Sequence, residues 1–310
     1  MTQTLILVSA DTESGDEAKE DSAIGSLKLN SFDPNDIEFD LYTSSNPNIP
    51  IRLFPDNITA ISSANFLTSC PLKYILHGYD ADASNFWWTE MKDEYLKAGS
   101  YNIILVNWSK LCDKSDISVI PNTYIVAKYG AEIINGLIRA GVLNVTMGLH
   151  IIGHDIGAHA ASLTANLAGS GKVSRITGLD PAKIVFGKFG DDFRLDFTDA
   201  PMVDVIHTDG GVTGFLETRG TIDFFPNGGK IQPGCLVHGC NHFRALDLFI
   251  ESISNPTAFK ACKCSSYEDY KKKKCRCNEI TYMGEFASPT SSPGSYFLQT
   301  NSFPPYNKPS

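Results

Sequence analysis

The sequence predicts an α/β fold built on a mainly parallel central sheet. Short apolar stretches of strand length alternate with segments of helical spacing along most of the 310 residues. One stretch, residues 149–161, runs from an apolar strand through a glycine-bracketed turn into a helix of small residues. Polar side chains follow the predicted strands at His77, Asp155, Asp180 and His207. Because ligands bind beyond the carboxyl ends of parallel strands, these residues are candidates for a common site.

Composition and charge exclude several classes of protein. The chain is 42% apolar, which is typical of a globular fold, and its net charge of -9 argues against a nucleic-acid partner. No apolar run approaches the ~18 residues of a transmembrane helix, so we expect no membrane span. Residues 1–32 are interpreted as a flexible leader. The apolar patch at residues 5–8 is too short for a signal peptide, so the signal has either been trimmed or is absent.

The remaining elements are expected within one domain, residues 33–310. Strands are predicted at residues 37–42, 73–79, 101–108, 173–180 and 203–207, in addition to the strand that enters the glycine-bracketed turn. The first alternates apolar and polar residues, as a strand covered on one face does, whereas residues 101–108 are apolar and buried on both faces. Residues 124–140 have helical spacing.

The turn at residues 153–157 has the pattern of a nucleophile elbow. In that motif, G-x-S-x-G, the central residue projects from a sharp strand-to-helix turn toward the substrate. The glycines are required because the turn is strained and neighbouring backbone comes close. Here the central residue is Asp155, so a carboxylate stands at the helix N-terminus in place of a hydroxyl group.

Asp180 and His242 are the candidate acid and base. Pro181 stops the strand after Asp180 and fixes a turn that aims its carboxylate inward. The chain order of elbow residue, acid and histidine is that of the α/β-hydrolases, which predicts an α/β-hydrolase fold. The backbone N–H groups of Tyr79 and Ile156 are the candidate oxyanion donors.

Together these motifs resemble the animal pancreatic-lipase family, within its phospholipase A1 and insect-lipase branch. The matching segments are residues 75–79, 106–109, 153–159, 178–182, 206–209, 223–229, 232–235 and 240–242. The resemblance implies a lipid or fatty-acyl substrate, Asp180 and His242 as triad acid and base, and Tyr79 and Ile156 as oxyanion donors. It also implies that Asp155 replaces the nucleophilic serine.

The cysteines favour an oxidising compartment, and the sequons at Asn57, Asn107 and Asn144 are compatible with secretion, so we expect a secreted, glycosylated protein. The resemblance implies the bonds Cys235–Cys240 and Cys70–Cys112. It also implies two nested bridges among Cys262, Cys264, Cys275 and Cys277, although four cysteines allow three pairings. Four residues lie between Cys235 and Cys240, too few for the helical lid of a triglyceride lipase. We expect no C-terminal β-sandwich and therefore no colipase partner.

The carboxylate at the elbow argues against ordinary lipase action, because acylation of Asp155 would give an anhydride. Two carboxylates around His242 favour the imidazolium. We interpret Asp155 as a base that removes a C–H proton from an oxygenated long-chain fatty acid, with dehydration or rearrangement of a hydroperoxide favoured. The alternatives are an inactive homologue that binds or stores lipid, nucleophilic opening of an epoxide, and residual phospholipase A1 or lipase activity. No cofactor and no metal are expected.

Several other side chains have competing interpretations. His154 and His159 are expected to pack beneath the elbow, and His207 to be structural rather than to touch substrate. Trp87 and Trp88 are expected in the core or the cleft wall. The run Lys271 to Lys274 is either a solvated loop, which we favour, or a patch for anionic lipid.

Overall fold

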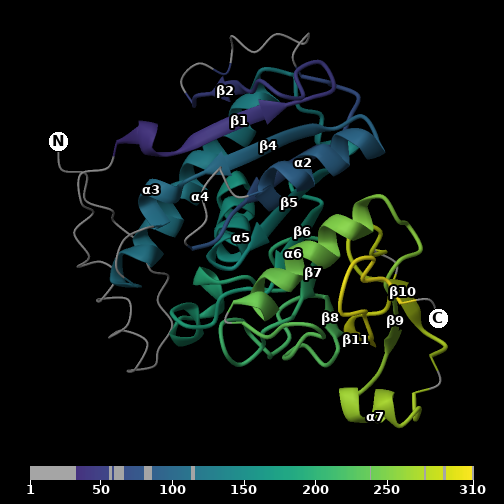
Figure 1. Cartoon of the computed structure of the whole chain (residues 1–310). Helices are drawn as coiled ribbons and strands as arrows, with labels where there is room; N and C mark the ends of the chain where they lie inside the picture. The colour runs from purple at the N-terminus through teal and green to yellow at the C-terminus, as the bar shows by residue number, and fades with distance from the viewer. Residues whose placement is uncertain are drawn as a thin grey trace.

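A computed structural model describes residues 33–55, 58, 66–79, 86–112, 116–237, 239–275, 277–288 and 291–308. The predicted leader, residues 1–32, lies outside this part. The described residues form one sheet of eleven strands in the order β10-β9-β11-β8-β7-β6-β5-β3-β4-β1-β2, with helices on both faces (Figure 1). This is the predicted α/β-hydrolase architecture in a single domain.

The centre of the sheet is parallel and its two margins are antiparallel. The parallel strands are β3 (Leu72–Leu76), β4 (Asn102–Asn107), β5 (Leu149–His154), β6 (Arg175–Leu179), β7 (Val203–Ile206), β8 (Ile222–Pro226) and β11 (Gly294–Leu298). The antiparallel strands are β1 (Glu38–Tyr42), β2 (Ile51–Leu53), β9 (Lys260–Lys263) and β10 (Ile280–Tyr282). All carboxyl ends of the parallel strands therefore meet at one edge of the sheet.

Two apolar layers enclose the sheet. On one face α4 (Asp116–Arg139) and α5 (Ile156–Ala168) pack onto strand residues such as Ile104 and Ile151. On the other, α2 (Phe86–Ala98) and α6 (Cys240–Ile253) pack onto their strand neighbours Ile103 and Ile152. Neighbouring residues of a strand point to opposite faces, which explains why the central strands are apolar throughout. The shorter helices are α3 (Ser109–Cys112), α7 (Tyr267–Lys271) and the 3-10 turns Pro34–Asp36, Val145–Met147, Phe186–Lys188 and Asp191–Phe193.

The predicted elements differ from the structure mainly at their ends. The strand predicted at residues 73–79 ends at Leu76, so Tyr79 lies in the loop beyond β3. The helix predicted from residue 124 begins at Asp116 and contains Pro121. That proline obscures the helical pattern in the sequence, because proline removes a backbone donor and disfavours a helix interior. No helix in the described part is both long enough and apolar enough to cross a membrane.

Six cysteines form three disulfides: Cys235–Cys240, Cys262–Cys277 and Cys264–Cys275. The last two are nested, which selects one of the three possible pairings. The expected Cys70–Cys112 bond is wrong, because the two residues are not bonded to each other. Cys70 precedes the amino end of β3, whereas Cys112 lies beyond the carboxyl end of the adjacent parallel strand β4. A strand of six residues separates the two edges by roughly 20 Å, and a disulfide needs Cα atoms within about 7 Å.

Candidate active site

Asp155 occupies a strained position between β5 and α5. Its backbone dihedral angles are φ 57° and ψ −123°, a conformation that residues other than glycine rarely adopt. Residues with such strained backbone conformations cluster at functional sites. Both bracketing glycines are required by close backbone contacts. A Cβ atom on Gly153 would lie 2.2 Å from the carbonyl oxygen of Gly157, and one on Gly157 would lie 2.3 Å from that of His77. The segment is therefore an elbow that presents Asp155 at the carboxyl edge of the sheet.

His242, at the start of α6, lies between two carboxylates. Its Nδ1 is 2.6 Å from Oδ2 of Asp180, and its Nε2 is 3.3 Å from Oδ1 of Asp155. The structure thus brings together the three residues that the sequence singled out, and all three are buried. Asp180 is held in place because its Oδ1 accepts hydrogen bonds from the backbone N–H groups of Thr208 (2.8 Å) and Asp209 (2.9 Å).

The two expected oxyanion donors, the backbone N–H groups of Tyr79 and Ile156, differ in whether they already donate to the elbow carboxylate. The N–H of Tyr79 donates to Oδ2 of Asp155 at 2.9 Å, so this donor holds the elbow carboxylate itself. Gly78 makes the approach possible, since a Cβ there would lie 2.4 Å from the Cβ of Asp155. Ile156 begins α5, and an N–H in the first turn has no partner within its own helix.

The charges of the site reinforce one another. Burial lowers the pKa of His242, but hydrogen bonds to Asp155 and Asp180 and their charges outweigh burial and raise that pKa to about 10. Burial raises the pKa of Asp155, but the hydrogen bond and charge of His242 lower it to about 2. Near neutral pH the site therefore contains an imidazolium between two carboxylates, which is a proton donor beside a proton acceptor.

Two histidines near the elbow support it without carrying charge. The ring of His154 packs against that of His242 at a tilt of 41°, with 4.4 Å between the ring centroids. Burial, followed by the charge of His242, lowers the pKa of His154 to about 3. His159 accepts from the N–H of Leu195 (3.0 Å) and donates to the carbonyl of Ala182 (2.8 Å). Burial lowers its pKa to about 4, so both rings are neutral at neutral pH.

His77 and His207 also make structural contacts. The N–H of Trp108 donates to Nε2 of His77 at 3.0 Å, which ties the loop that carries Tyr79 to the end of β4. His207 lies between the carbonyl of Phe215 (2.7 Å) and the carboxylate of Asp223 (2.8 Å). Trp87 and Trp88 are buried on the α2 side of the sheet, where the ring of Trp87 meets that of His154.

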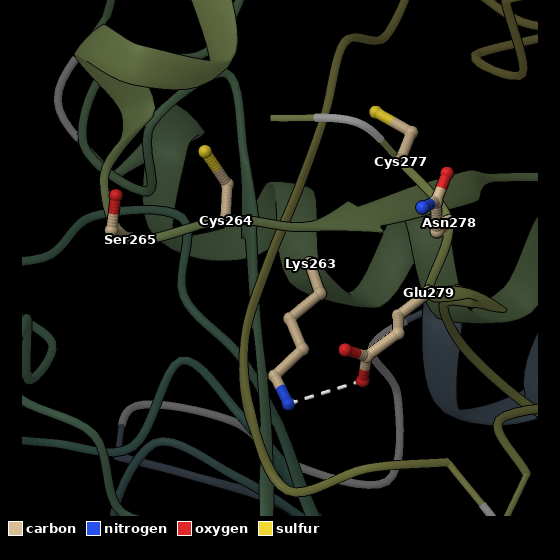
Figure 2. A pocket seen from close by; sticks show the side chains of 6 residues that line it. All are labelled: Lys263, Cys264, Ser265, Cys277, Asn278 and Glu279. Atoms are coloured by element: carbon tan, nitrogen blue, oxygen red, sulfur yellow. Dashed lines mark hydrogen bonds and ion pairs between the residues drawn. The ribbon is translucent and has the colours of Figure 1, made fainter. Parts of the chain in front are cut away.

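A separate pocket of about 400 Å³ lies in the disulfide-bonded segment around β9 and α7 (Figure 2). It is lined by Lys263, Cys264, Ser265, Cys277, Asn278 and Glu279. Lys263 and Glu279 form an ion pair across it at 3.2 Å.

In the part of the chain that the structure describes, no three His, Cys, Asp or Glu side chains converge as metal ligands.

Sequence reasoning missed two supports of the site. The N–H groups of Thr208 and Asp209 that hold Asp180 are backbone groups, and residue types do not reveal where they point. The contact of His154 with His242 depends on the packing of β5 against α6, although the alternation of faces along β5 could have placed His154 on that side.

Comparison with known proteins shows what this chain is similar to. Pancreatic lipase-related protein 2 of Bos taurus is 33% identical over 314 residues, which cover 89% of this chain and 66% of that protein. Inactive pancreatic lipase-related protein 1 of Canis lupus familiaris is 32% identical and covers 90% of this chain and 67% of its own length. A solved α/β hydrolase from a deep-sea metagenome library is 17% identical, with a TM-score of 0.34 over 57% of this chain and 66% of that chain.

The chain thus spans about two thirds of the length of the curated relatives that it matches. The family described as Lipase matches residues 3–306, which include the elbow, the acid and the histidine. This chain belongs to the lipase family.

Proposed function

We propose that the protein is an enzyme in which Asp155 and His242 act as base and acid on an oxygenated long-chain fatty acid. The favoured reaction is dehydration of a hydroperoxide to a ketone, without a cofactor. One observation carries this proposal: the ring of His242 lies between the carboxylates of Asp155 (3.3 Å) and Asp180 (2.6 Å), whose charges raise its pKa while its own charge lowers that of Asp155. The pair therefore holds its base and its acid in the required states before substrate arrives.

The reaction needs no external oxidant or reductant. Asp155 removes the proton from the carbon that bears the hydroperoxide, and the C–H electron pair forms the carbonyl bond. The O–O bond breaks, and the departing hydroxide takes the proton of His242 to become water. Once His242 is neutral, the charge that depresses the pKa of Asp155 is gone, so Asp155 becomes a stronger base as the reaction proceeds. Its proton then returns to His242.

Ordinary lipase action does not suit this site. Attack of the Asp155 carboxylate on an ester would form an anhydride, and the Tyr79 N–H that would stabilise a tetrahedral oxyanion already donates to Asp155. We therefore expect negligible triglyceride hydrolysis and no labelling by phosphonate inhibitors of serine lipases. The N–H of Ile156 is left to stabilise negative charge on the substrate oxygen.

Three disulfides support the proposal that the protein acts in an oxidising, extracellular setting.

The second candidate is a lipid-binding or storage protein without catalysis. It is supported by relatives whose names describe them as inactive, among them pancreatic lipase-related protein 1 of Canis lupus familiaris. The intact ion array favours the enzyme, since three buried ionisable groups are retained in contact. Epoxide opening, in which Asp155 attacks carbon and forms an ester, uses the same residues.

The test is incubation with long-chain fatty acid esters, epoxides and hydroperoxides, followed by mass spectrometry. Loss of water from a hydroperoxide supports the proposal, whereas gain of water by an ester or epoxide supports a hydrolase. Asp155→Asn keeps the size of the side chain but removes the base, so it should lower the dehydration rate about 10²-fold or more. If the parent converts none of these lipids, the lipid-binding protein replaces the enzyme. If the variant converts them as fast as the parent, Asp155 is not the base.

A further inference from the structure

His207, directly after β7, is a fully buried histidine outside the triad. Its ring lies between two oxygen atoms. Nδ1 is 2.7 Å from the backbone carbonyl oxygen of Phe215, and Nε2 is 2.8 Å from Oδ1 of Asp223. A carbonyl oxygen can only accept a hydrogen bond, so Nδ1 carries a hydrogen atom and donates it.

The carboxylate of Asp223 calls for a second hydrogen atom on the same ring. Its Oδ1 accepts from the backbone N–H groups of Arg219 (2.9 Å) and Gly220 (3.2 Å), which marks this oxygen as an acceptor. Nε2 of His207 therefore donates to it as well. A ring that donates from both nitrogens is an imidazolium, and a buried imidazolium needs an anionic partner such as this carboxylate. The ring of Phe225 stacks on it with 4.5 Å between centroids, a contact that a cation strengthens.

The carbonyl group that Nδ1 holds belongs to a segment that contacts the triad acid. We call this segment, residues 208–215, the clasp. At its start, the N–H groups of Thr208 and Asp209 donate to Oδ1 of Asp180. Near its end, Gly214 lies directly on the same carboxylate, where a Cβ atom would be 2.5 Å from Oδ1. Both ends of the clasp therefore determine where the carboxylate lies.

His207 joins the two ends of the clasp. Its backbone adjoins the first residue of the clasp, and its ring holds the carbonyl group of the last residue, Phe215. The N–H of Phe215 donates to the carbonyl of Pro181, the residue after Asp180, at 2.9 Å. Asp223, on the neighbouring strand β8, fixes the ring in turn (Figure 1). A neutral ring could donate to only one of its two acceptors, so holding both requires the charged form.

We propose that His207 is a positioning residue for the triad acid. As an imidazolium paired with Asp223, it holds the clasp closed on Asp180. The Asp180 carboxylate is thereby kept in contact with the ring of His242, 2.6 Å away. His207 is fully buried and acts only through the clasp. This role concerns the position of Asp180 and does not depend on the reaction proposed for Asp155.

The protonation of the His207 ring can be measured directly. In NMR of histidine labelled with nitrogen-15 near neutral pH, both ring nitrogens of His207 should carry a hydrogen atom and show the shifts of an imidazolium. His159 is the internal reference, because its Nδ1 accepts and its Nε2 donates, so one of its nitrogens should be bare. A bare nitrogen on His207 would overturn the proposal.

Substitution tests the link between His207 and the triad. His207→Phe keeps a ring that can stack but removes both donors, which releases the clasp. The pKa of His242, about 10 in the parent, should then fall by about one pH unit as Asp180 moves away. The matched control is His150→Phe. His150 is also buried and hydrogen-bonded, to Thr177 at 2.8 Å, but it lies near the amino end of β5, at the opposite edge.

The control should cost stability and leave the pKa of His242 unchanged. An equal shift in His150→Phe, or no shift in His207→Phe, would show that His207 is a structural residue only. Asp223→Asn serves where circular dichroism shows that His207→Phe does not fold. It removes the charge that pairs with the imidazolium but keeps the shape, so His207 should lose one ring hydrogen atom and the pKa of His242 should fall.

A His207 ring that stays doubly protonated in Asp223→Asn, with an unchanged pKa of His242, would contradict the role of the ion pair in the clasp. All of these readouts are spectroscopic and need no turnover. Failure of the reaction proposed for Asp155 is therefore distinguishable from failure of the clasp.

Discussion

At the scale of single residues, the proposed chemistry depends on the charge of His242. In a serine hydrolase the equivalent ring must be neutral in order to accept a proton, whereas here two carboxylates keep it protonated. In the proposed reaction the elbow residue therefore changes the role of the histidine from base to acid. The consequence is open to direct measurement, because removing one carboxylate must move the pKa of His242.

We expect the His242 ring to titrate well above neutral pH, with a midpoint near the value of about 10 given by its surroundings. Asp155→Asn removes one hydrogen-bonding charge and should lower that midpoint. NMR of ring-labelled histidine reports both, and His159, with a pKa of about 4, serves as the internal control that stays neutral. A His242 midpoint that is the same in both proteins would show that the pair is not coupled.

Gly78 offers a second test at this scale. Gly78→Ala places a methyl group within 2.4 Å of the Cβ of Asp155, so either the loop or the carboxylate must move and the Tyr79 contact is lost. We expect a loss of at least ~10²-fold in kcat with secondary structure retained by circular dichroism. Gly141→Ala is the control, since its Cβ would meet open space and only local backbone strain applies.

The triad could be predicted from the sequence because each member adjoins a recognisable signal. Asp155 lies between two glycines and Asp180 before a proline, and strand ends converge wherever the sheet is parallel. The contact between Tyr79 and Asp155 could not be predicted, because it depends on the rotamer of one side chain. A sequence shows which groups share an edge but not which of them touch.

At the scale of elements, a buried ionic network fastens the segment after β10 to the amino ends of the central strands. Lys73 of β3 pairs with Glu285, whose other oxygen accepts from the hydroxyl group of Tyr95. Arg175 of β6 donates to the carbonyls of Gly284 (2.7 Å) and Glu285 (2.6 Å). The network lies at the edge opposite the active site, which gives it a structural role.

Breaking this network should be costly. Glu285→Gln leaves Lys73 buried without its partner charge and should lower the free energy of unfolding by about 3 kcal/mol. Lys73→Met/Glu285→Gln removes both charges and should cost less than the sum of the single changes Lys73→Met and Glu285→Gln. Urea unfolding of the four proteins gives the coupling energy, and additive effects would mean that the pair is not coupled.

Elements were predictable where they are long and periodic. Strands β1 and β3 to β7 and helices α4 and α5 were recognised, whereas β8, β11 and α6 were not predicted. The strands β2, β9 and β10 were also missed, because they are short strands at the sheet margins with no clear alternation. The wrong Cys70–Cys112 bond has a related cause. Pairing cysteines from a family resemblance says nothing about which end of a strand each cysteine occupies, and these two are at opposite edges.

At the scale of the whole molecule, the ion array links stability to pH. The pKa of His242 is raised from 6.5 to about 10, so its contribution is complete below pH ~6.5 and is lost as pH rises through about 10. The pKa of Asp155 is lowered from 3.8 to about 2, so its contribution is complete above pH ~3.8 and is lost as pH falls through about 2. Both contributions are complete only between about pH 4 and pH 6.5.

We therefore expect the stability difference between the parent and Asp155→Asn to be largest near pH 5 and to shrink by pH 10.5. Urea unfolding at these two values measures it, and a constant difference would contradict the linkage. The proposed dehydration needs protonated His242, so its rate should persist through pH 8 and decline toward pH 10. A reaction that used neutral His242 would show the opposite trend.

The imidazolium between two carboxylates has one further consequence. The array carries a net negative charge of one near neutral pH and is buried. A second anion beside it would be repelled in a medium of low dielectric constant, so the carboxylate of a free fatty acid must stay distant from the elbow. In the proposed reaction we therefore expect carbons in the middle or tail of the chain to react, with the charged head left at the water boundary. Methyl esters of mid-chain hydroperoxides should react at least as fast as the free acids.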